Sequence, residues 1–439
     1  MKNVTVIGAG LAGCEAAWAL AHRGIPVTLY EMKPIKYSPA HTYQGFGELV
    51  CSNSLKASRL NSAAGLLKAE METMDSLVVR CAKESAVSAG GALAVDRRQF
   101  SDAMTKAVTS LPLVTVAHEE VTKIPEGEVI IASGPLTSEA LSEKVGALCG
   151  EKYLSFYDAS APIVAYDSID LDRVYFATRY GRGEADYINC SFNKEEYETF
   201  YEALVNAQSV ELHEFEKDFF KVYEGCMPIE VLAKRGLDTM RYGPLRPVGL
   251  KDPRTGHRPW ANIQLRRDNA EGSLYNIVGF QTNLLFPEQK RVFSMIPGLE
   301  HAEFVRYGVM HRNTFLDSPR LLNGVFQLKK DPRIFFAGQI TGVEGYIESA
   351  ASGIVAGHAM ADRLQNRKTE LPPEDTMIGS LCRYISDETV TEFQPMGSNM
   401  GILPPLPTLL RAKEERYQAL ADRAMTAMQE YWKQEGRIL

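Results

Sequence analysis

The first pattern along the chain is a short apolar run, a helical stretch and a second apolar run. Residues 4–7 are apolar and mostly β-branched, which predicts a buried strand. Residues 15–23 favour a helix, which Gly24 and Pro26 end. Residues 27–30 predict the second strand. A strand, a helix and a strand in this order are typical of α/β proteins with a parallel sheet.

The turn between the first strand and the first helix has glycine at three spaced positions. Gly8 allows a tight turn, Gly10 lets the backbone approach a pyrophosphate, and Gly13 lets the helix pack on the strand. Glu31, at the end of the second strand, can accept hydrogen bonds from ribose hydroxyls. These features together predict a dinucleotide site. Its expected residues are Gly8, Ala9, Gly10, Leu11, Ala12, Gly13 and Glu31.

A second glycine segment favours FAD over NAD as the dinucleotide. An apolar strand over 333–337 ends in Gly338 and Gln339, and a helical stretch over 349–356 follows. Flavoproteins of the two-dinucleotide-binding type use such a unit against the ribityl chain and the flavin ring; many have Asp where Gln339 stands. A third run, 129–132, resembles the strand that returns to the FAD domain. We therefore add Ser133, Gly134, Gly338 and Gln339 to the expected FAD site.

The rest of the chain has a different organisation. Strand-like runs at 163–166 and 187–192 alternate with a predicted helix over 194–206. The expected fold class is α/β, with a Rossmann-like FAD domain, an inserted α+β domain and a helical C-terminal tail. The expected domains are 1–150 with 330–370 for FAD, 151–329 for the insertion, and 371–439 for a Pro/Gly-rich segment and a helix over 408–435.

Composition excludes several classes of protein. The chain has 439 residues, 45% of them hydrophobic and 23% charged, as in ordinary globular proteins. No apolar run has the roughly 20 residues of a membrane span. The seven cysteines form no CxxC pair and no zinc-type cluster, so we expect a cytoplasmic protein with reduced thiols and no metal. Nothing in the sequence indicates a stable protein partner.

Charge is uneven along the chain. The net charge is −7, yet the segment 230–270 holds nine basic and four acidic residues, with Tyr242, His257 and Trp260 interleaved. Basic residues that hold phosphates and aromatic rings that stack on bases would suit an RNA surface. A solvated face with internal salt bridges is the alternative. The candidate RNA-binding residues are Lys234, Arg235, Arg241, Arg246, Arg254 and Arg258.

The cysteines fall into two groups. An apolar repeat over 67–81 predicts an amphipathic helix with Cys81 on its buried face. Cys51 and Cys226 differ, because both lie in polar or Gly/Pro-containing segments without apolar periodicity. A thiol near a helix N-terminus, as we expect for Cys51, has its thiolate favoured. Two such thiols and a flavin also suit a dithiol/disulfide oxidoreductase. The cysteines interpreted as buried apolar residues are Cys14, Cys81, Cys149, Cys190 and Cys382.

Six motifs are spread over the chain: GAGLAGCEAA (8–17), EMKP (31–34), ELVCSNSL (48–55), EGCMPIE (224–230), MRYGPLRPVGL (240–250) and GQITGVEGY (338–346). Together they resemble one known family over essentially the whole chain, the TrmFO family of folate- and FAD-dependent tRNA (uracil-5-)-methyltransferases. The related wobble-uridine enzyme MnmG (GidA) shares the glycine segments but carries a long C-terminal helical domain. Lys56 departs mildly from the Arg that is frequent in the family.

The resemblance implies a reaction and roles for residues. A one-carbon unit would pass from methylenetetrahydrofolate to carbon 5 of uridine 54 in the T loop of tRNA. Reduced FAD would complete the methyl group, and NADH or NADPH would reduce the FAD. Cys226 would be the nucleophile at carbon 6 and Cys51 the base or its relay, although the reverse assignment stays open. The resemblance adds Lys33, Glu344, Gly345 and Tyr346 to the cofactor site.

Four alternatives remain at this stage. The same chemistry could act on a ribosomal RNA uridine, as in one branch of the family. A flavin disulfide reductase would need Cys51 and Cys226 close enough to bridge. A wobble-uridine enzyme would need a longer chain. A non-enzymatic RNA-binding flavoprotein would keep its activity without Cys226.

Overall fold

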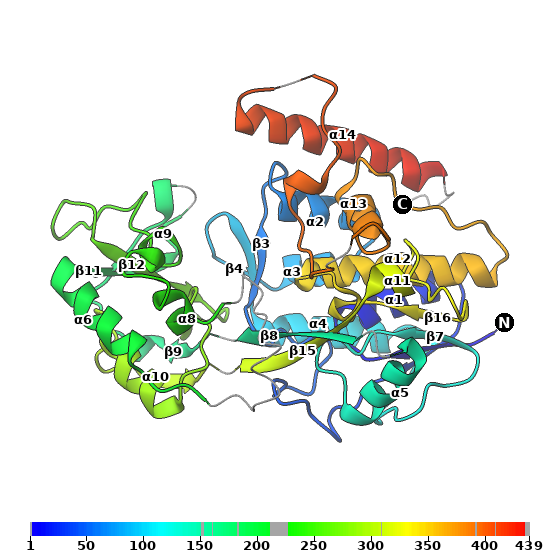
Figure 1. Cartoon of the computed structure of the whole chain (residues 1–439), viewed down its shortest axis with the longest axis horizontal. Helices are drawn as coiled ribbons and strands as arrows, with labels where there is room; N and C mark the ends of the chain where they lie inside the picture. The colour runs from blue at the N-terminus through cyan, green and yellow to red at the C-terminus, as the bar shows by residue number, and fades with distance from the viewer. Residues whose placement is uncertain are drawn as a thin grey trace.

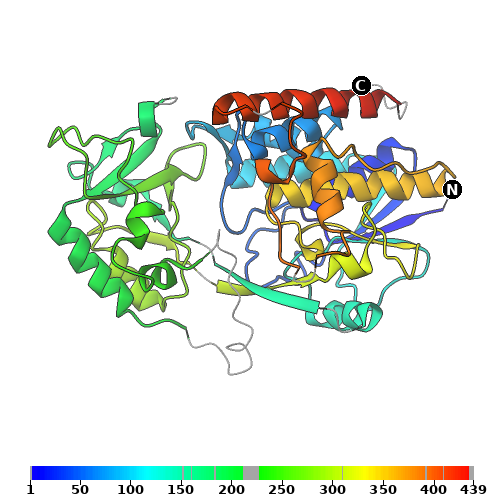
Figure 2. The same cartoon turned by 45° about the horizontal axis from the view of Figure 1, so that its top comes forward.

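The computed structural model describes residues 2–150, 153–159, 161–181, 184–210, 227–308, 310–390, 393–408 and 410–434. Figures 1 and 2 show two lobes, with the N-terminal and C-terminal parts of the chain together in one and the middle of the chain in the other. The lobes have separate hydrophobic cores, and the core of the second lobe is built from residues between 161 and 304.

The first lobe is built on a five-stranded parallel sheet with the strand order β16-β7-β1-β2-β6. In this order β1 is the central strand, with β2 and β6 on one side and β7 and β16 on the other. The mixed α/β fold predicted from the sequence is thereby confirmed. The strands are β1 (Val4–Ile7), β2 (Val27–Tyr30), β6 (Val114–Ala117), β7 (Glu128–Ile131) and β16 (Ile334–Phe336).

Two helices cross one face of this sheet in close contact. They are α1 (Leu11–His22) and α12 (Tyr346–Leu364), and both are largely buried. A Cβ added at Gly353 would lie 2.2 Å from the carbonyl oxygen of Ala12, so only glycine permits this approach. The helix predicted over 15–23 exists, but it begins at Leu11, directly after the glycine turn.

The helix predicted over 67–81 is interrupted, and that expectation was wrong. The chain forms α2 (Ala63–Thr73) and α3 (Leu77–Glu84) with a turn between them. Asp75 in this turn has a φ of 57°. The side chain of Ser76 accepts from the backbone N–H of Val79 and begins the second helix. The second helix, α3, is amphipathic, and Cys81 is buried on it as predicted.

The second lobe holds a six-stranded sheet with the order β10-β11-β12-β13-β9-β14, in which every pairing is antiparallel. Phe192, Phe200, Phe280 and Phe293 are fully buried beside it. The strands predicted at 163–166 and 187–192 and the helix at 194–206 are confirmed within one residue. The strands are β9 (Ile163–Ala165), β10 (Tyr175–Phe176), β11 (Tyr187–Phe192), β12 (Ala261–Arg267), β13 (Leu274–Ile277) and β14 (Phe304–Arg306).

Two small sheets lie where the lobes meet. The antiparallel pair β8 (Tyr153–Ala159) and β15 (Met310–Leu316) runs between the lobes (Figure 1). Strands β3 (Ser54–Ala57), β5 (Ala92–Val95) and β4 (Ala86–Val87) form a three-stranded sheet on the side of the first lobe. The first of these strands directly follows the segment that contains Cys51.

The remaining helices complete the two lobes. The tail helix begins at Lys413 and covers α2 on the outside of the first lobe (Figure 2). None of the described helices has both the length and the apolarity needed to cross a membrane. These helices are α4 (Arg97–Thr109), α5 (Glu139–Cys149), α6 (Lys194–Val205), α8 (Ile229–Ala233), α9 (Thr239–Tyr242), α10 (Phe286–Phe293), α11 (Ser318–Leu321), α13 (Met377–Tyr384) and α14 (Lys413–Gln434).

Candidate functional site

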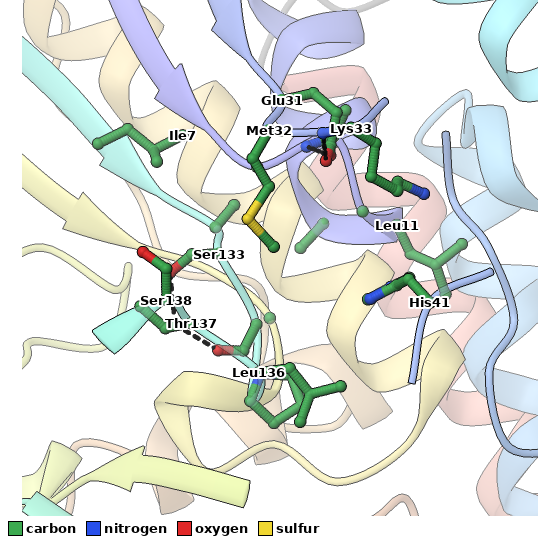
Figure 3. Close-up of a pocket in the computed structure, with 18 of the residues that line it drawn as sticks. Ile7, Leu11, Glu31, Met32, Lys33, His41, Ser133, Leu136, Thr137 and Ser138 are labelled. Carbon is green, nitrogen blue, oxygen red and sulfur yellow. Dashed lines mark hydrogen bonds between the residues drawn. The ribbon is translucent and has the colours of Figure 1, made fainter. Parts of the chain in front are cut away.

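A pocket opens at the carboxyl ends of β1, β2 and β7, where ligands bind in open α/β sheets. In Figure 3, Glu31 and Met32 lie on one side of it and Ser133 and Thr137 on the other. The pocket continues along Gly338, Gln339 and Tyr346. Its wall also includes His41, Gly47, Glu48 and Val50, from the long loop after β2.

The glycine turn has the geometry that the sequence predicted. Gly8 has a φ of +99°, in the region that favours glycine. A Cβ on Gly13 would lie 1.8 Å from the carbonyl oxygen of Gly8, so the helix could not approach the strand with any larger residue. A Cβ on Gly10 would meet no atom within 4 Å, because Gly10 faces the pocket. The structure therefore leaves open space at the residue expected to face a pyrophosphate.

The Glu31 side chain stabilises this turn through hydrogen bonds. Its carboxylate is buried and accepts the backbone N–H of Ala9 at 2.9 Å and that of Lys33 at 3.0 Å. One carboxylate oxygen thus holds the glycine turn and the other holds the chain after β2. Carboxylate oxygens have two lone pairs each, so the same group retains capacity for a ribose hydroxyl.

Lys33 lines the pocket, but its ammonium group is engaged with the loop after β2. It donates to the carbonyl oxygens of Tyr43 at 3.1 Å and Gly45 at 2.7 Å, and lies 3.4 Å from the Glu48 carboxylate. These contacts fix the loop that forms one wall of the pocket. The geometry therefore favours an indirect role for the Lys33 side chain.

The second glycine segment forms the far wall. Gly338, with a φ of +86°, donates its N–H to the hydroxyl of Ser352 at 2.7 Å. Gln339 donates to the Glu344 carboxylate at 2.7 Å, so Glu344 acts on the pocket through Gln339. Gly345 has a φ of +122° and comes just before Tyr346, the first residue of α12.

Cys51 directly follows Val50, which lines the pocket, and its backbone contacts the pocket residue Tyr346. The hydroxyl oxygen of Tyr346 accepts the backbone N–H of Cys51 at 2.7 Å and that of Ser52 at 3.3 Å. Burial raises the pKa of the Tyr346 hydroxyl, which therefore stays protonated. The residues after Cys51 enter strand β3, not a helix. The expected helix N-terminus beside this thiol was wrong.

Three arginines that the sequence did not single out donate hydrogen bonds to residues 49–53, here called the Cys51 segment. Arg97 donates to the carbonyl oxygens of Leu49 and, at 3.4 Å, of Cys51. Arg306 donates to the carbonyl oxygen of Val50. Arg266 donates to the hydroxyl of Ser52 at 2.7 Å and to the Asn53 side chain at 3.0 Å.

These arginines come from both lobes. Arg97 begins α4 in the first lobe, whereas Arg266 lies in β12 and Arg306 ends β14 in the second. Arg97 also pairs with Asp268 at 3.1 Å, and this carboxylate raises the pKa of Arg97 against the opposing effect of burial. Burial lowers the pKa of both Arg266 and Arg306. No local sequence pattern joins residues so far apart in the chain.

The other cysteines divide as the sequence indicated, as far as the structure describes them. Cys226 lies outside the described residues. Burial raises the pKa of Cys81 and of Cys149 to about 11 and that of Cys382 to about 12. Such thiols are inert at neutral pH. The five cysteines predicted to be buried, Cys14, Cys81, Cys149, Cys190 and Cys382, are each at most 4% exposed.

The basic segment lies on the second lobe, and its residues differ in their contacts. Arg254 pairs with Asp252 at 2.7 Å, so the salt-bridge alternative holds for that residue. Arg241 pairs with Asp238 and lies 3.8 Å from the ring centre of Trp260. Tyr242 beside it is 87% exposed. Four of the candidate residues are exposed and form no ion pair within the residues that the structure describes: Lys234, Arg235, Arg246 and Arg258.

Comparisons with known proteins agree with this geometry. The model of the family described as Glucose inhibited division protein A matches residues 3–368. The solved structure of Aquifex aeolicus GidA superimposes with a TM-score of 0.73, 17% identity, and coverage of 100% of this chain and 74% of that chain. The fold and the glycine-lined pocket thus define the class, a flavoprotein of the GidA type.

Closer relatives identify the family within this class. A Listeria innocua protein is 58% identical over 427 residues, which are 97% of this chain and 98% of that protein. A Shouchella clausii protein is 56% identical over 433 residues, which are 99% of each chain. Both are named methylenetetrahydrofolate–tRNA-(uracil-5-)-methyltransferase TrmFO. The chain belongs to the TrmFO family of methyltransferases, and the resemblance seen in its sequence is confirmed.

Proposed function

We propose that this chain transfers a one-carbon unit from methylenetetrahydrofolate to carbon 5 of uridine 54 in the T loop of tRNA. We further propose that NADH or NADPH reduces the bound FAD and that the enzyme works in the cytoplasm. The observation that carries the proposal is the contact between the Cys51 backbone and Tyr346, because it joins a thiol segment to the FAD pocket. A general-purpose flavin oxidase has no need of a thiol there.

FAD fits the residues of the pocket. The space in front of Gly10 and the N-terminus of α1 suit the pyrophosphate, and Glu31 suits a ribose hydroxyl. Gly338, Gln339 and Tyr346 would then lie along the ribityl chain and the ring. When bound and reduced, FAD supplies the hydride that turns an exocyclic methylene into a methyl group.

The two thiols have complementary roles in the proposal. Carbon 5 of uracil is a weak nucleophile, and addition of the Cys226 thiolate to carbon 6 makes it an enolate carbon that attacks the methylene donor. Cys51, or a group that it relays to, removes the carbon-5 proton as the folate amine leaves. The Cys226 thiolate is expelled when the methyl group is completed, which restores the uracil double bond.

Access to carbon 5 requires the uridine to leave the stacked T loop. The exposed basic residues of the second lobe, with Tyr242 and the Arg241–Trp260 pair beside them, are suited to hold the RNA backbone and an unstacked base. Arg254 is the weakest candidate in this set, since Asp252 already neutralises it.

The target is tested with an unmodified tRNA transcript, methylenetetrahydrofolate and NADPH. We expect 5-methyluridine at position 54, and none in a transcript with cytidine at that position. Equal activity on a ribosomal RNA fragment, with none on tRNA, would move the proposal to the ribosomal branch. A methyl label drawn from S-adenosylmethionine would refute the folate chemistry.

The thiol assignment is tested with tRNA that carries 5-fluorouridine at position 54, because fluorine blocks proton removal and leaves the covalent adduct in place. The Cys51→Ala protein should still form the adduct, whereas the Cys226→Ala protein should form none. The opposite pattern would exchange the two roles. Cys190→Ala, a change at a fully buried thiol of the second lobe, is the matched control and should trap RNA like the parent protein.

A further inference from the structure

The charge around the Cys51 segment is unbalanced in the described part of the chain. The guanidinium groups of three arginines bond to this segment: Arg97, Arg266 and Arg306. The one carboxylate among these bonded groups is that of Asp268, which pairs with Arg97. Arg266 and Asp268 are 7% and 4% exposed, and the Arg97 side chain is 14% exposed. Positive charge without a counter-charge is costly in such a place unless an anion forms or binds there.

The geometry points to the anion that this charge would stabilise. Arg97 and Arg306 donate to the carbonyl oxygens of Leu49, Val50 and Cys51, so both guanidinium groups are held against this short stretch. A negative charge on Cys51 would in turn favour the charged forms of both arginines. Tyr346 holds the same stretch through neutral hydrogen bonds to the backbone N–H groups of Cys51 and Ser52.

We propose that Arg97 and Arg306 are positioning residues that hold the Cys51 segment in place and favour the thiolate form of its side chain. They favour the thiolate in place of the helix N-terminus that the sequence led us to expect beside Cys51. The proposal rests on the function proposed above for Cys51 as the base or its relay, because a base must be deprotonated before it acts. Asp268 limits the effect of Arg97 and leaves Arg306 as the less compensated charge.

The test follows alkylation of Cys51 by iodoacetamide against pH in the full-length, FAD-loaded protein, with the Cys51 peptide quantified by mass spectrometry. Only the thiolate reacts, so the midpoint of the rate profile reports the protonation of this thiol. Arg306→Gln and Arg97→Gln should each raise the midpoint by about one pH unit. Arg97→Lys keeps the charge and should stay within a few tenths of a unit of the parent protein.

Controls separate charge from folding. FAD content and melting temperature are measured for each variant, and Arg291→Gln, an exposed change at a Glu288 pair, should leave the midpoint unchanged. The double variant Arg97→Gln/Asp268→Asn removes a balanced pair and provides a second test should Arg97→Gln alone fail to fold. Its midpoint should rise by less than that of Arg306→Gln.

Two results would overturn the proposal. One is a midpoint that stays in place in Arg306→Gln and the Arg97 variants while their melting temperatures fall, which would show a structural role alone. The other is a shift in Arg97→Lys as large as in Arg97→Gln. Because no tRNA or folate is present, the shift is measured independently of whether the chain methylates uridine.

Discussion

At the scale of single residues, the glycine turn separates packing from ligand binding. Gly13 is closed in by the Gly8 carbonyl, whereas Gly10 faces empty space in the pocket with a φ of −73° that any residue can adopt. The two positions belong to one motif, yet their side-chain restrictions have different physical origins. A matched pair of alanine substitutions can therefore distinguish a fold requirement from a cofactor requirement.

Gly13→Ala should lower the free energy of unfolding by about 3 kcal/mol, because the new Cβ would overlap the carbonyl oxygen of Gly8. Gly10→Ala should leave the melting temperature of the apoprotein unchanged and weaken FAD binding by roughly 10- to 100-fold, as expected when backbone bonds to a phosphate are disturbed. Urea unfolding and fluorescence titration with FAD measure the two effects. Equal FAD affinity in Gly10→Ala and the parent would contradict the pyrophosphate assignment.

Tyr346 is a second residue whose role can be separated into parts. Its hydroxyl satisfies the backbone N–H groups of Cys51 and Ser52, so Tyr346→Phe leaves them without that acceptor. The expected cost is about 1–3 kcal/mol, concentrated in the Cys51 segment. We expect a fall in kcat with nearly unchanged FAD affinity, measured by steady-state kinetics. Parent-like kcat would mean that only the ring of Tyr346 matters.

At the scale of elements, two buried glutamates hold the ends of helices that come from elsewhere in the chain. Glu15 on α1 accepts the backbone N–H groups of Leu77 and Val78 at the start of α3. Glu70 on α2 accepts those of Met377 and Ile378 at the start of α13. Burial raises the pKa of Glu15 to about 7 and that of Glu70 to about 8.

These raised values set the sign of a pH dependence. The folded protein holds protons that the unfolded chain releases above its ordinary carboxyl pKa of 4.5, so this contribution to stability falls as pH rises from about 4.5 to about 8. Glu70→Gln removes the larger part of this dependence. Urea unfolding between pH 5 and pH 8.5 should give a flatter profile in the variant, and an unchanged slope would refute the assignment.

The same helices show where prediction from sequence ends. Apolar periodicity gave the correct type for the strands around the glycine turn and for the helix over 194–206. It joined α2 and α3 because the apolar repeat continues through Asp75, where the backbone φ reverses sign. It did not find α13 in the Pro/Gly-rich segment, where Thr376 caps the helix locally and the distant Glu70 accepts two further backbone N–H groups of the first turn.

Some residues of the candidate site could be predicted from the sequence, and others could not. The glycines and Glu31 could be found because one local motif encodes them. Arg97, Arg266 and Arg306 could not, because three separate elements bring them to the Cys51 segment. A charged residue in a helix or strand is usually a solvated one, and only the tertiary structure reveals its burial.

At the scale of the whole molecule, the two separate hydrophobic cores suit two domains with different functions. We propose that 1–150 with 330–370 bind FAD, that 151–329 receive the RNA, and that the 371–439 segment supports the first lobe through α14. Asn53 donates to the carbonyl oxygens of Val95 and Arg267, at 3.0 and 2.9 Å, and so bonds to both lobes. The thiol segment thus lies where the proposed cofactor and RNA domains meet.

The exposed basic residues of the second lobe should contribute to tRNA binding through their charge. Arg246 and Arg258 are exposed on the second lobe, and the double variant Arg246→Ala/Arg258→Ala should weaken tRNA binding without changing FAD binding. The slope of log Kd against log salt should fall by about 2, one for each lost phosphate contact. Filter binding at several salt concentrations measures this slope. Arg291→Ala is the control, and equal slopes in both variants would exclude this surface.

We propose that the flavin, and not folate, completes the methyl group on a tRNA uridine. The most direct test of this proposal is one reaction in D2O with methylenetetrahydrofolate, NADPH and unmodified tRNA, followed by mass spectrometry of the nucleosides. Hydrogen on the reduced flavin exchanges with solvent, whereas hydrogen on the folate carbons does not. We predict 5-methyluridine whose methyl group carries one deuterium. A methyl group without deuterium, or no 5-methyluridine at all, would contradict it.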